Sequence, residues 1–219
     1  MNKLRQVLLG GGLVLTTVTA QAADISGNVT LATDYVYRGV TQTSGEAAVQ
    51  GGFDILADNG LYAGIWGSNI AFDGSVEIDY FVGFSNEVFE GFGYDVGVLH
   101  YDYPNQPAGS LDSDFEEIYF NFTYKAFTFG AAYSNDFFDE TEIGVYSYGE
   151  YELSLPSDIS LVFHYGAQKI DKAITYDEFS ISLSKEIADI SFSLAYYDTD
   201  ENGIDDFDNR VVFALSKSL

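Results

Sequence analysis

The chain has 219 residues, 47% of them hydrophobic, which suffices for one sizeable domain. It is rich in glycine, tyrosine and phenylalanine and poor in proline, with one tryptophan and no cysteine, so we expect glycine-rich, aromatic β-structure without disulfides. The formal net charge of −25 argues against a nucleic-acid partner, because phosphate contacts need clusters of Lys and Arg.

The first 22 residues have the pattern of a cleavable signal peptide. Lys3 and Arg5 precede an apolar run from Val7 to Val18, and Ala20-Gln21-Ala22 has the small-x-small spacing of a cleavage site. We therefore expect an exported mature chain of residues 23–219. No later segment has about 18 consecutive apolar residues, so a mature chain that spans a membrane would have to be a closed β-barrel.

From residue 23 onward, apolar residues alternate with small or polar ones along successive segments. In the segment FSISLS, for example, Phe179, Ile181 and Leu183 alternate with serines. Side chains of a strand alternate between its two faces, so each segment predicts a strand with one apolar face. About twelve strands are predicted, near residues 26–37, 47–57, 61–70, 75–86, 92–103, 115–124, 127–134, 142–150, 159–168, 177–185, 190–197 and 210–218.

The connections between these segments alternate in length. Short links at 58–60, 125–126 and 185–189 take turns with longer polar ones at 38–46, 104–114, 135–141, 169–176 and 198–209. Short periplasmic turns, longer outer loops and an even number of strands of about 9–11 residues are typical of bacterial outer-membrane barrels.

A secreted β-sandwich is the alternative architecture, but its apolar faces meet each other, whereas those of a membrane barrel meet lipid. Two features favour lipid: the opposite faces are small and polar, and aromatic residues gather near strand ends as in interfacial girdles. These aromatic residues are Tyr35, Tyr37, Phe92, Tyr94, Tyr101, Tyr103, Tyr133, Tyr196 and Tyr197. The predicted fold is therefore all-β, a transmembrane antiparallel up-and-down β-barrel of about twelve strands.

Three segments also resemble a known family, namely ATDYVYRGVTQT (32–43), GLYAGIWGSN (60–69) and VEIDYFVGF (76–84). They are similar to the TorF family, a proteobacterial group of exported proteins of similar size that are named as porins. The likeness covers most of the mature chain in order and is most specific at GxWGSN. The resemblance implies an outer-membrane barrel with a channel role, and it adds no mechanism.

If the apolar rows face lipid, the opposite rows line a lumen. The charged residues predicted to line it are Asp34, Arg38, Asp54, Glu77, Asp79, Asp95, Glu117, His164, Glu178 and Arg210, among small residues that leave room for water. Most are acidic, so we expect a weak preference for cations. Each acid could instead serve only as a structural partner of a neighbouring strand. A ladder of inward Arg and Lys, which acidic oligosaccharides would need, is not supplied by this sequence.

Arg38 and Arg210 fall at the outer ends of the first and last predicted strands, which adjoin when the barrel closes. We expect them to lie near each other at the mouth, paired with Asp34 or with loop acids. The alternatives are a structural ion pair and a constriction that contacts solute.

The loop DTDENGIDDFDN, residues 198–209, contains one metal-like motif. Asp198, Asp200, Asn202 and Gly203 match the start of a calcium-binding loop, and Asp206 stands where a water-mediated ligand sits. Asn209 replaces the bidentate Glu of that loop, and the flanks look like strands rather than helices. Calcium ligated by Asp198, Asp200, Asn202 and Asp206 and a solvated acidic loop therefore both stay open.

The facing of Trp66 is ambiguous in the sequence, as is that of the strand near 142–150; a lumenal Trp66 could form part of a constriction. Catalysis has little support. The chain has no cysteine, its histidines are His100 and His164, and no serine spacing near His100 indicates a nucleophile. We expect no enzyme activity.

The leading hypothesis is an outer-membrane porin for passive diffusion of ions or small polar solutes, with no cofactor unless the 198–209 loop binds Ca²⁺. The competing hypothesis is a non-conducting barrel whose acidic outer loops bind a partner or divalent cations. Outer-membrane lipid and lipopolysaccharide are expected partners in both cases. The choice depends on whether loops fold inward and plug the barrel.

Overall fold

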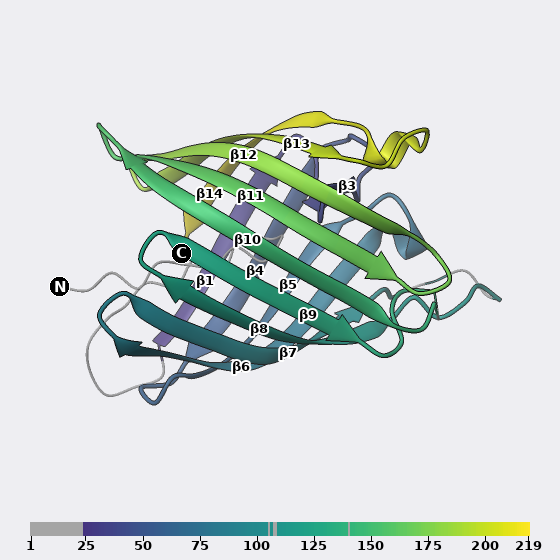
Figure 1. The fold of residues 1–219 in the computed structure, drawn as a ribbon, viewed down its shortest axis with the longest axis horizontal. Helices are drawn as coiled ribbons and strands as arrows, with labels where there is room; N and C mark the ends of the chain where they lie inside the picture. The colour runs from purple at the N-terminus through teal and green to yellow at the C-terminus, as the bar shows by residue number, and fades with distance from the viewer. Residues whose placement is uncertain (1–23, 105, 107–108, 140) are drawn as a thin grey trace.

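The computed structural model describes residues 24–104, 106, 109–139 and 141–219, so the predicted signal peptide, residues 1–22, lies outside the described residues. A closed antiparallel barrel of twelve strands makes up most of the described chain, which confirms the predicted fold (Figure 1). The strands are β1 (Asp24–Ala32), β4 (Ala48–Leu56), β5 (Leu61–Asn69), β6 (Val76–Phe89), β7 (Phe92–Asp102), β8 (Phe115–Tyr124), β9 (Phe127–Ser134), β10 (Gly144–Leu155), β11 (Ile159–Ile170), β12 (Thr175–Ile187), β13 (Ile190–Thr199) and β14 (Arg210–Ser218).

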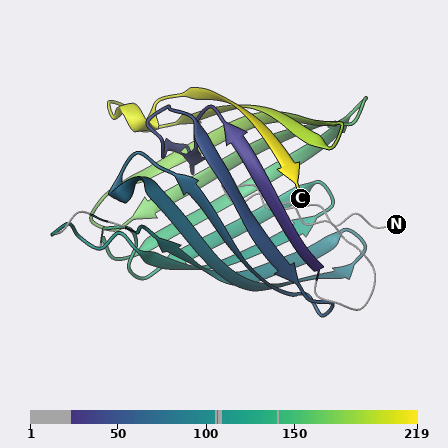
Figure 2. The same ribbon diagram turned by 180° about the vertical axis from the view of Figure 1, so that it is seen from behind.

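Each strand pairs with its sequence neighbour, and the barrel closes between the first strand and the last. β14 pairs with β1 in a register that sets Asn28 opposite Ser218 and Ala32 opposite Ala214 (Figure 2). The short connections 57–60, 90–91, 125–126, 156–158 and 188–189 all lie at one end of the barrel, together with the start of β1 and the end of β14. The other connections, most of them longer, lie at the opposite end, which we call the outer end.

The outer surface of the barrel wall is apolar. On β12, Phe179, Ile181 and Leu183 expose 40%, 41% and 42% of their surface, while the intervening serines are less exposed. The same alternation runs through the other strands, because the pleat sends successive side chains to opposite faces. Within the described residues, no helix is long and apolar enough to cross a membrane.

Five tyrosines that the sequence assigned to interfacial girdles lie elsewhere, and one of them is Tyr197, which is half-buried on the inner face of β13 opposite Ser180. Tyr35, Tyr101 and Tyr103 are at most 5% exposed, and Tyr37 is half-buried against them, so these rings pack inside the barrel. Their hydroxyl groups find partners among the interior polar groups, as buried tyrosines require. Tyr133 and Tyr196 are exposed on the outer surface, as girdle residues should be.

The first outer connection, residues 33–47, departs most from the predicted strands. β1 ends at Ala32 rather than near residue 37, and the chain then forms a short hairpin of β2 (Val36–Tyr37) and β3 (Val40–Thr41). Arg38 and Gly39 form its turn, with φ angles of 48° and 83°. Two successive positive φ values are the geometry of a tight type I′ hairpin, and Gly39 adopts it without strain. We call residues 33–47 the inner hairpin.

Aromatic side chains from three other outer connections pack together at the outer end. Phe72, just before the short helix η1 (Asp73–Ser75), contacts the rings of Tyr103 and Phe138 at centroid distances of 6.0 and 5.7 Å. The same three connections are also joined by polar contacts: Ser113 is fully buried, and its hydroxyl lies 2.7 Å from Asp73 Oδ2 and 3.0 Å from Asp139 Oδ1. These three outer connections therefore pack against one another in one aromatic layer.

Candidate functional site

The inner hairpin crosses the interior of the barrel. Its turn residue Arg38 forms a bidentate ion pair with Glu117 of β8, with Nη1–Oε1 and Nη2–Oε2 distances of 2.9 and 2.7 Å. Nη1 also donates to Oε1 of Gln168 on β11 at 2.8 Å. Around the barrel, β8 lies five strands from β1 in one direction and seven in the other. Arg38 thus connects the first strand to the opposite wall.

Aromatic rings enclose the Arg38 guanidinium. Its central carbon lies 4.2 Å from the ring centroid of Tyr146 and 4.6 Å from that of Tyr37, both within the range of a cation–π contact. The hydroxyl of Tyr101 donates to Glu117 Oε2 at 3.1 Å. Burial opposes the positive charge, but the Glu117 carboxylate outweighs it and raises the pKa of the Arg38 guanidinium above its ordinary value. Arg38 is therefore a buried, charged side chain whose two terminal nitrogens both have hydrogen-bond acceptors.

The base of the inner hairpin is fastened at the mouth of the barrel by Asp34. One carboxylate oxygen of Asp34 accepts hydrogen bonds from Thr41 and Thr43 at 2.6 and 2.7 Å. The other pairs with Arg210 Nη1 at 3.0 Å, as expected for Arg210. The matching expectation for Arg38 is wrong, because the hairpin turn carries it to Glu117 instead of to Asp34 or a loop acid.

The tip of the inner hairpin packs against β12 and β13. A Cβ atom built on Gly39 would lie 2.7 Å from Thr199 Cγ2 and 2.8 Å from Glu178 Cβ, so only glycine fits there. Glu178 in turn accepts a hydrogen bond from Tyr146 at 2.5 Å and contacts His164 Nε2 at 2.6 Å. The other imidazole nitrogen of His164 is 2.9 Å from Glu150.

Two further acids, Glu77 and Asp79, lie side by side on the inner face of β6. Tyr35 of the inner hairpin donates to Glu77 at 2.7 Å and packs edge-on against Trp66, with ring centroids 5.4 Å apart. Trp66 is 6% exposed and stands opposite Asp79 in the strand register, so it faces the interior. Asp79 is 7% exposed, and its Oδ1 has no hydrogen-bond partner among the described residues.

The remaining predicted interior acids lie deeper in the barrel. Asp95 of β7 accepts a hydrogen bond from Tyr62 at 2.5 Å, and Tyr62 also contacts the hydroxyl of Tyr119. Asp54 of β4 is 3% exposed, and its Oδ1 has no partner among the described residues. All ten charged residues that the sequence placed in a lumen thus have buried or half-buried side chains inside the barrel.

Sequence reasoning missed the neutral part of this interior. Gln168 is 1% exposed, and Tyr146 and Tyr148 are 5% and 8% exposed on a strand whose facing the sequence leaves open. Tyrosines fill space that the small inward residues were expected to leave for water. Tyr146 and Tyr148 stand at alternate positions of β10 together with Glu150, and this shared face is the sequence signal that could have predicted that they point inward.

The acidic loop 198–209 does not gather its carboxylates around one point. Asp198 accepts hydrogen bonds from Tyr196 and from the backbone of Thr199, and Asp200 accepts one from the backbone of Asp177. Arg210 donates to the carbonyl oxygens of Asp205 and Asp206, next to the short helix η2 (Asp205–Phe207). In the part of the chain that the structure describes, no group of three or more His, Cys, Asp or Glu could hold a metal ion.

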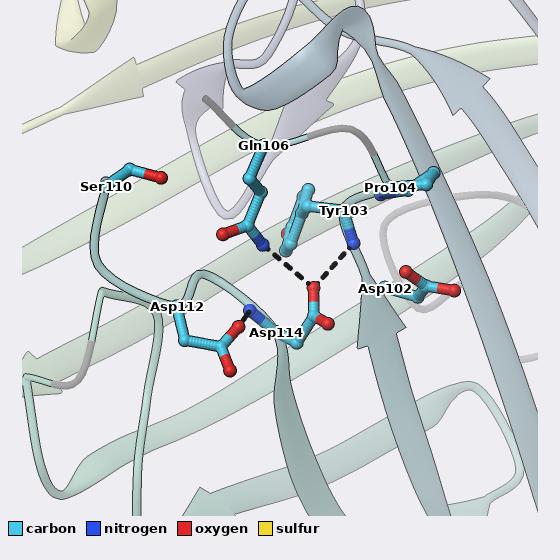
Figure 3. A pocket seen from close by; sticks show the side chains of 7 residues that line it. All are labelled: Asp102, Tyr103, Pro104, Gln106, Ser110, Asp112 and Asp114. Atoms are coloured by element: carbon cyan, nitrogen blue, oxygen red, sulfur yellow. Dashed lines mark hydrogen bonds between the residues drawn. The ribbon is translucent and has the colours of Figure 1, made fainter. Parts of the chain in front are cut away.

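A second acidic region lies at the outer end, where a pocket of about 440 Å³ opens beside the connection after β7. Figure 3 shows its lining of Asp102, Tyr103, Pro104, Gln106, Ser110, Asp112 and Asp114. Asp114 accepts hydrogen bonds from the Tyr103 backbone at 2.7 Å and from Gln106 at 3.1 Å. The pocket is polar and open to solvent.

Residues 17–218 match the sequence model of a family described as "Bacterial protein of unknown function (Gcw_chp)". The chain belongs to this family. The TorF resemblance stays a prediction, because the matching Gcw_chp family carries another name. No curated protein matches the Gcw_chp chain.

Solved structures share the fold of this Gcw_chp member at low sequence identity. The structure titled "KdgM porin" is 8% identical with a TM-score of 0.63, and the match covers 89% of this chain and 99% of that chain. A second KdgM structure, in complex with disordered oligogalacturonate, has a TM-score of 0.61 at 8% identity and covers 89% and 98%. The NanC porin is 12% identical with a TM-score of 0.54, covering 88% and 98%. These matches cover most of both chains in each case, and what they show is a shared fold.

Proposed function

We propose that this protein is an outer-membrane channel through which ions or small polar solutes diffuse passively, with a weak preference for cations. The observation that carries the proposal is a closed barrel whose outer surface is apolar and whose interior is lined by charged and hydrogen-bonding groups. A barrel with these two faces suits a lipid bilayer on the outside and water on the inside. The fold shared with porins supports the same assignment.

The preference for cations follows from the interior charges. Arg38 is neutralised by Glu117, and Arg210 by Asp34, whereas Glu77 and Asp79 have no basic partner among the described residues. Surplus carboxylates in a narrow, low-dielectric passage attract cations and repel anions. The interior has too few basic groups for a solute that carries many negative charges.

Planar-bilayer recording of the refolded mature protein under a salt gradient tests the channel. We expect stepwise conductance with a reversal potential biased toward cations, and we expect Asp79→Asn to reduce that bias. Glu116→Gln is the matched control, because Glu116 is an exposed acid on the outer surface of β8 and should leave the bias unchanged. Conductance with an anion bias would contradict the role given to the surplus interior carboxylates, and it would still support a channel.

The second candidate function is a non-conducting barrel that binds divalent cations, lipopolysaccharide or a protein partner through its acidic outer loops. The inner hairpin and the packed aromatic layer at the outer end favour it, because both occupy the path through the barrel. The pocket beside Asp112 and Asp114 and the acidic surface of the loop 198–209 would be the sites concerned, although neither gathers its carboxylates into a metal centre among the described residues. Absence of conductance from protein shown to be folded would favour this candidate.

A further inference from the structure

The partners of Arg38 on the barrel wall form a receptor for a guanidinium group. Glu117 on β8 offers its two carboxylate oxygens to the two terminal nitrogens of the guanidinium, and Gln168 on β11 offers a third acceptor. Tyr146 on β10 presents its ring face 4.2 Å from the guanidinium carbon. All three residues belong to barrel strands, so the receptor remains in place when the inner hairpin is elsewhere.

The charge of this wall exceeds what Arg38 neutralises. Glu178 is paired with His164, but Glu77 and Asp79 on the inner face of β6 have no basic partner among the described residues. Asp79 is buried, and its Oδ1 lacks a partner within the part of the chain that the structure describes, so the acids around the receptor are not a solvated surface cluster. If Arg38 leaves, Glu117 becomes an uncompensated buried charge, which is strongly unfavourable unless another cation replaces the guanidinium.

We propose that Glu117, Gln168 and Tyr146 form a binding site for small solutes that carry a guanidinium group, and that Arg38 occupies this site as an intramolecular ligand. A guanidinium fits better than an ammonium, because its planar fork matches a carboxylate in two parallel hydrogen bonds and its face stacks on an aromatic ring. A solute that displaces Arg38 also releases the tip of the inner hairpin. The inference deepens the proposed channel function and rests on it for the access of solute to the interior.

Chemical rescue tests the site. The mature Arg38→Ala protein, refolded in detergent, is titrated with methylguanidinium by isothermal calorimetry and by the fluorescence of Trp66, the single tryptophan, which lies inside the barrel. We expect saturable binding that Glu117→Gln in the same background weakens about tenfold or more, because two charge-assisted hydrogen bonds lose their ionic acceptor. The wild type should bind more weakly than Arg38→Ala, because its tethered arginine competes at high effective concentration.

Ligand and protein controls separate this site from general cation attraction. Methylammonium has the same charge and should bind more weakly, and N-methylurea has a similar planar shape without charge and should not bind. Arg210→Ala removes the other interior arginine, which has different partners, and should not create the site. Arg38→Gln replaces Arg38→Ala if circular dichroism shows that the alanine variant lacks β-structure.

The site is overturned if folded Arg38→Ala or Arg38→Gln protein shows no saturable binding, if Glu117→Gln leaves the affinity unchanged, or if methylammonium binds as tightly as methylguanidinium. The binding assay requires no conduction. Binding by a protein that does not conduct in planar bilayers would therefore support the guanidinium site and contradict the channel. Conductance without binding would support the channel and contradict the site.

Discussion

Arg38 follows β1 and Glu117 lies on β8, the fifth strand from β1 around the barrel wall, and yet they meet in a bidentate ion pair inside the barrel, with N–O distances of 2.9 and 2.7 Å. The contact exists because residues 33–47 turn inward after β1 instead of extending the barrel. The side chains of Arg38 and Glu117 are 5% and 2% exposed, so water screens their attraction little. This pair holds the turn of the inner hairpin against β8.

Removing the charge of Glu117 should destabilise the barrel more than removing that of its sequence neighbour. Glu117→Gln leaves Arg38 buried without its counter-charge, a change that typically costs about 3–5 kcal/mol. Glu116→Gln, next along the strand, breaks only an exposed contact with His100 and should cost less than about 1 kcal/mol. Urea unfolding of the two variants in lipid vesicles measures both losses, and equal losses would contradict the importance of the Arg38–Glu117 pair.

Gly39→Ala should release the tip of the inner hairpin. The new methyl group would clash with Thr199 and Glu178 at a residue whose φ of +83° already disfavours a side chain. Trypsin should then cleave after Arg38 faster than in the wild type. Gly45→Ala is the control, because Gly45 has a φ of +78° but open space around its Cβ position. Unchanged cleavage in Gly39→Ala would mean that the tip is not held by this contact.

Adjacent residues of β12 should differ in their access to water. The chain has no cysteine, so a single introduced thiol reports on its own position. In membranes, a water-soluble thiol reagent should label Ser182→Cys, which faces the interior, and should not label Leu183→Cys, whose side chain is exposed on the apolar outer surface. The reverse pattern would place the apolar rows inside and would exclude a lipid-facing barrel.

The strands were predictable because their pattern is local. Alternation along β12 and β13, and glycine or charged residues at the short turns, place most strand ends within a few residues of the structure. The same local rule failed at Val36 and Tyr37, which keep the alternation of β1 but belong to the inner hairpin. Gly39 was the available signal, since a glycine after Arg38 suits a tight turn.

The contacts of the site were less predictable than its residues. Inward parity selected Arg38, Glu117 and Glu178, but it does not say which residues meet across the barrel. The pairing of Arg38 with Glu117 depends on a fifteen-residue connection folding inward, residues 33–47, and this depends on long-range packing around Gly39 and Tyr35. Arg210 was simpler, because strand closure alone brings it to Asp34.

The conductance of a variant without the inner hairpin tests whether this hairpin narrows a channel. Replacing residues 35–42 by two glycines removes Tyr35, Tyr37 and Arg38 from the interior while leaving every barrel strand in place. We expect stepwise conductance in planar bilayers that is larger than that of the wild type under the same salt gradient. A variant that is folded and whose steps are no larger, or that conducts nothing, would contradict the view that this hairpin narrows a channel.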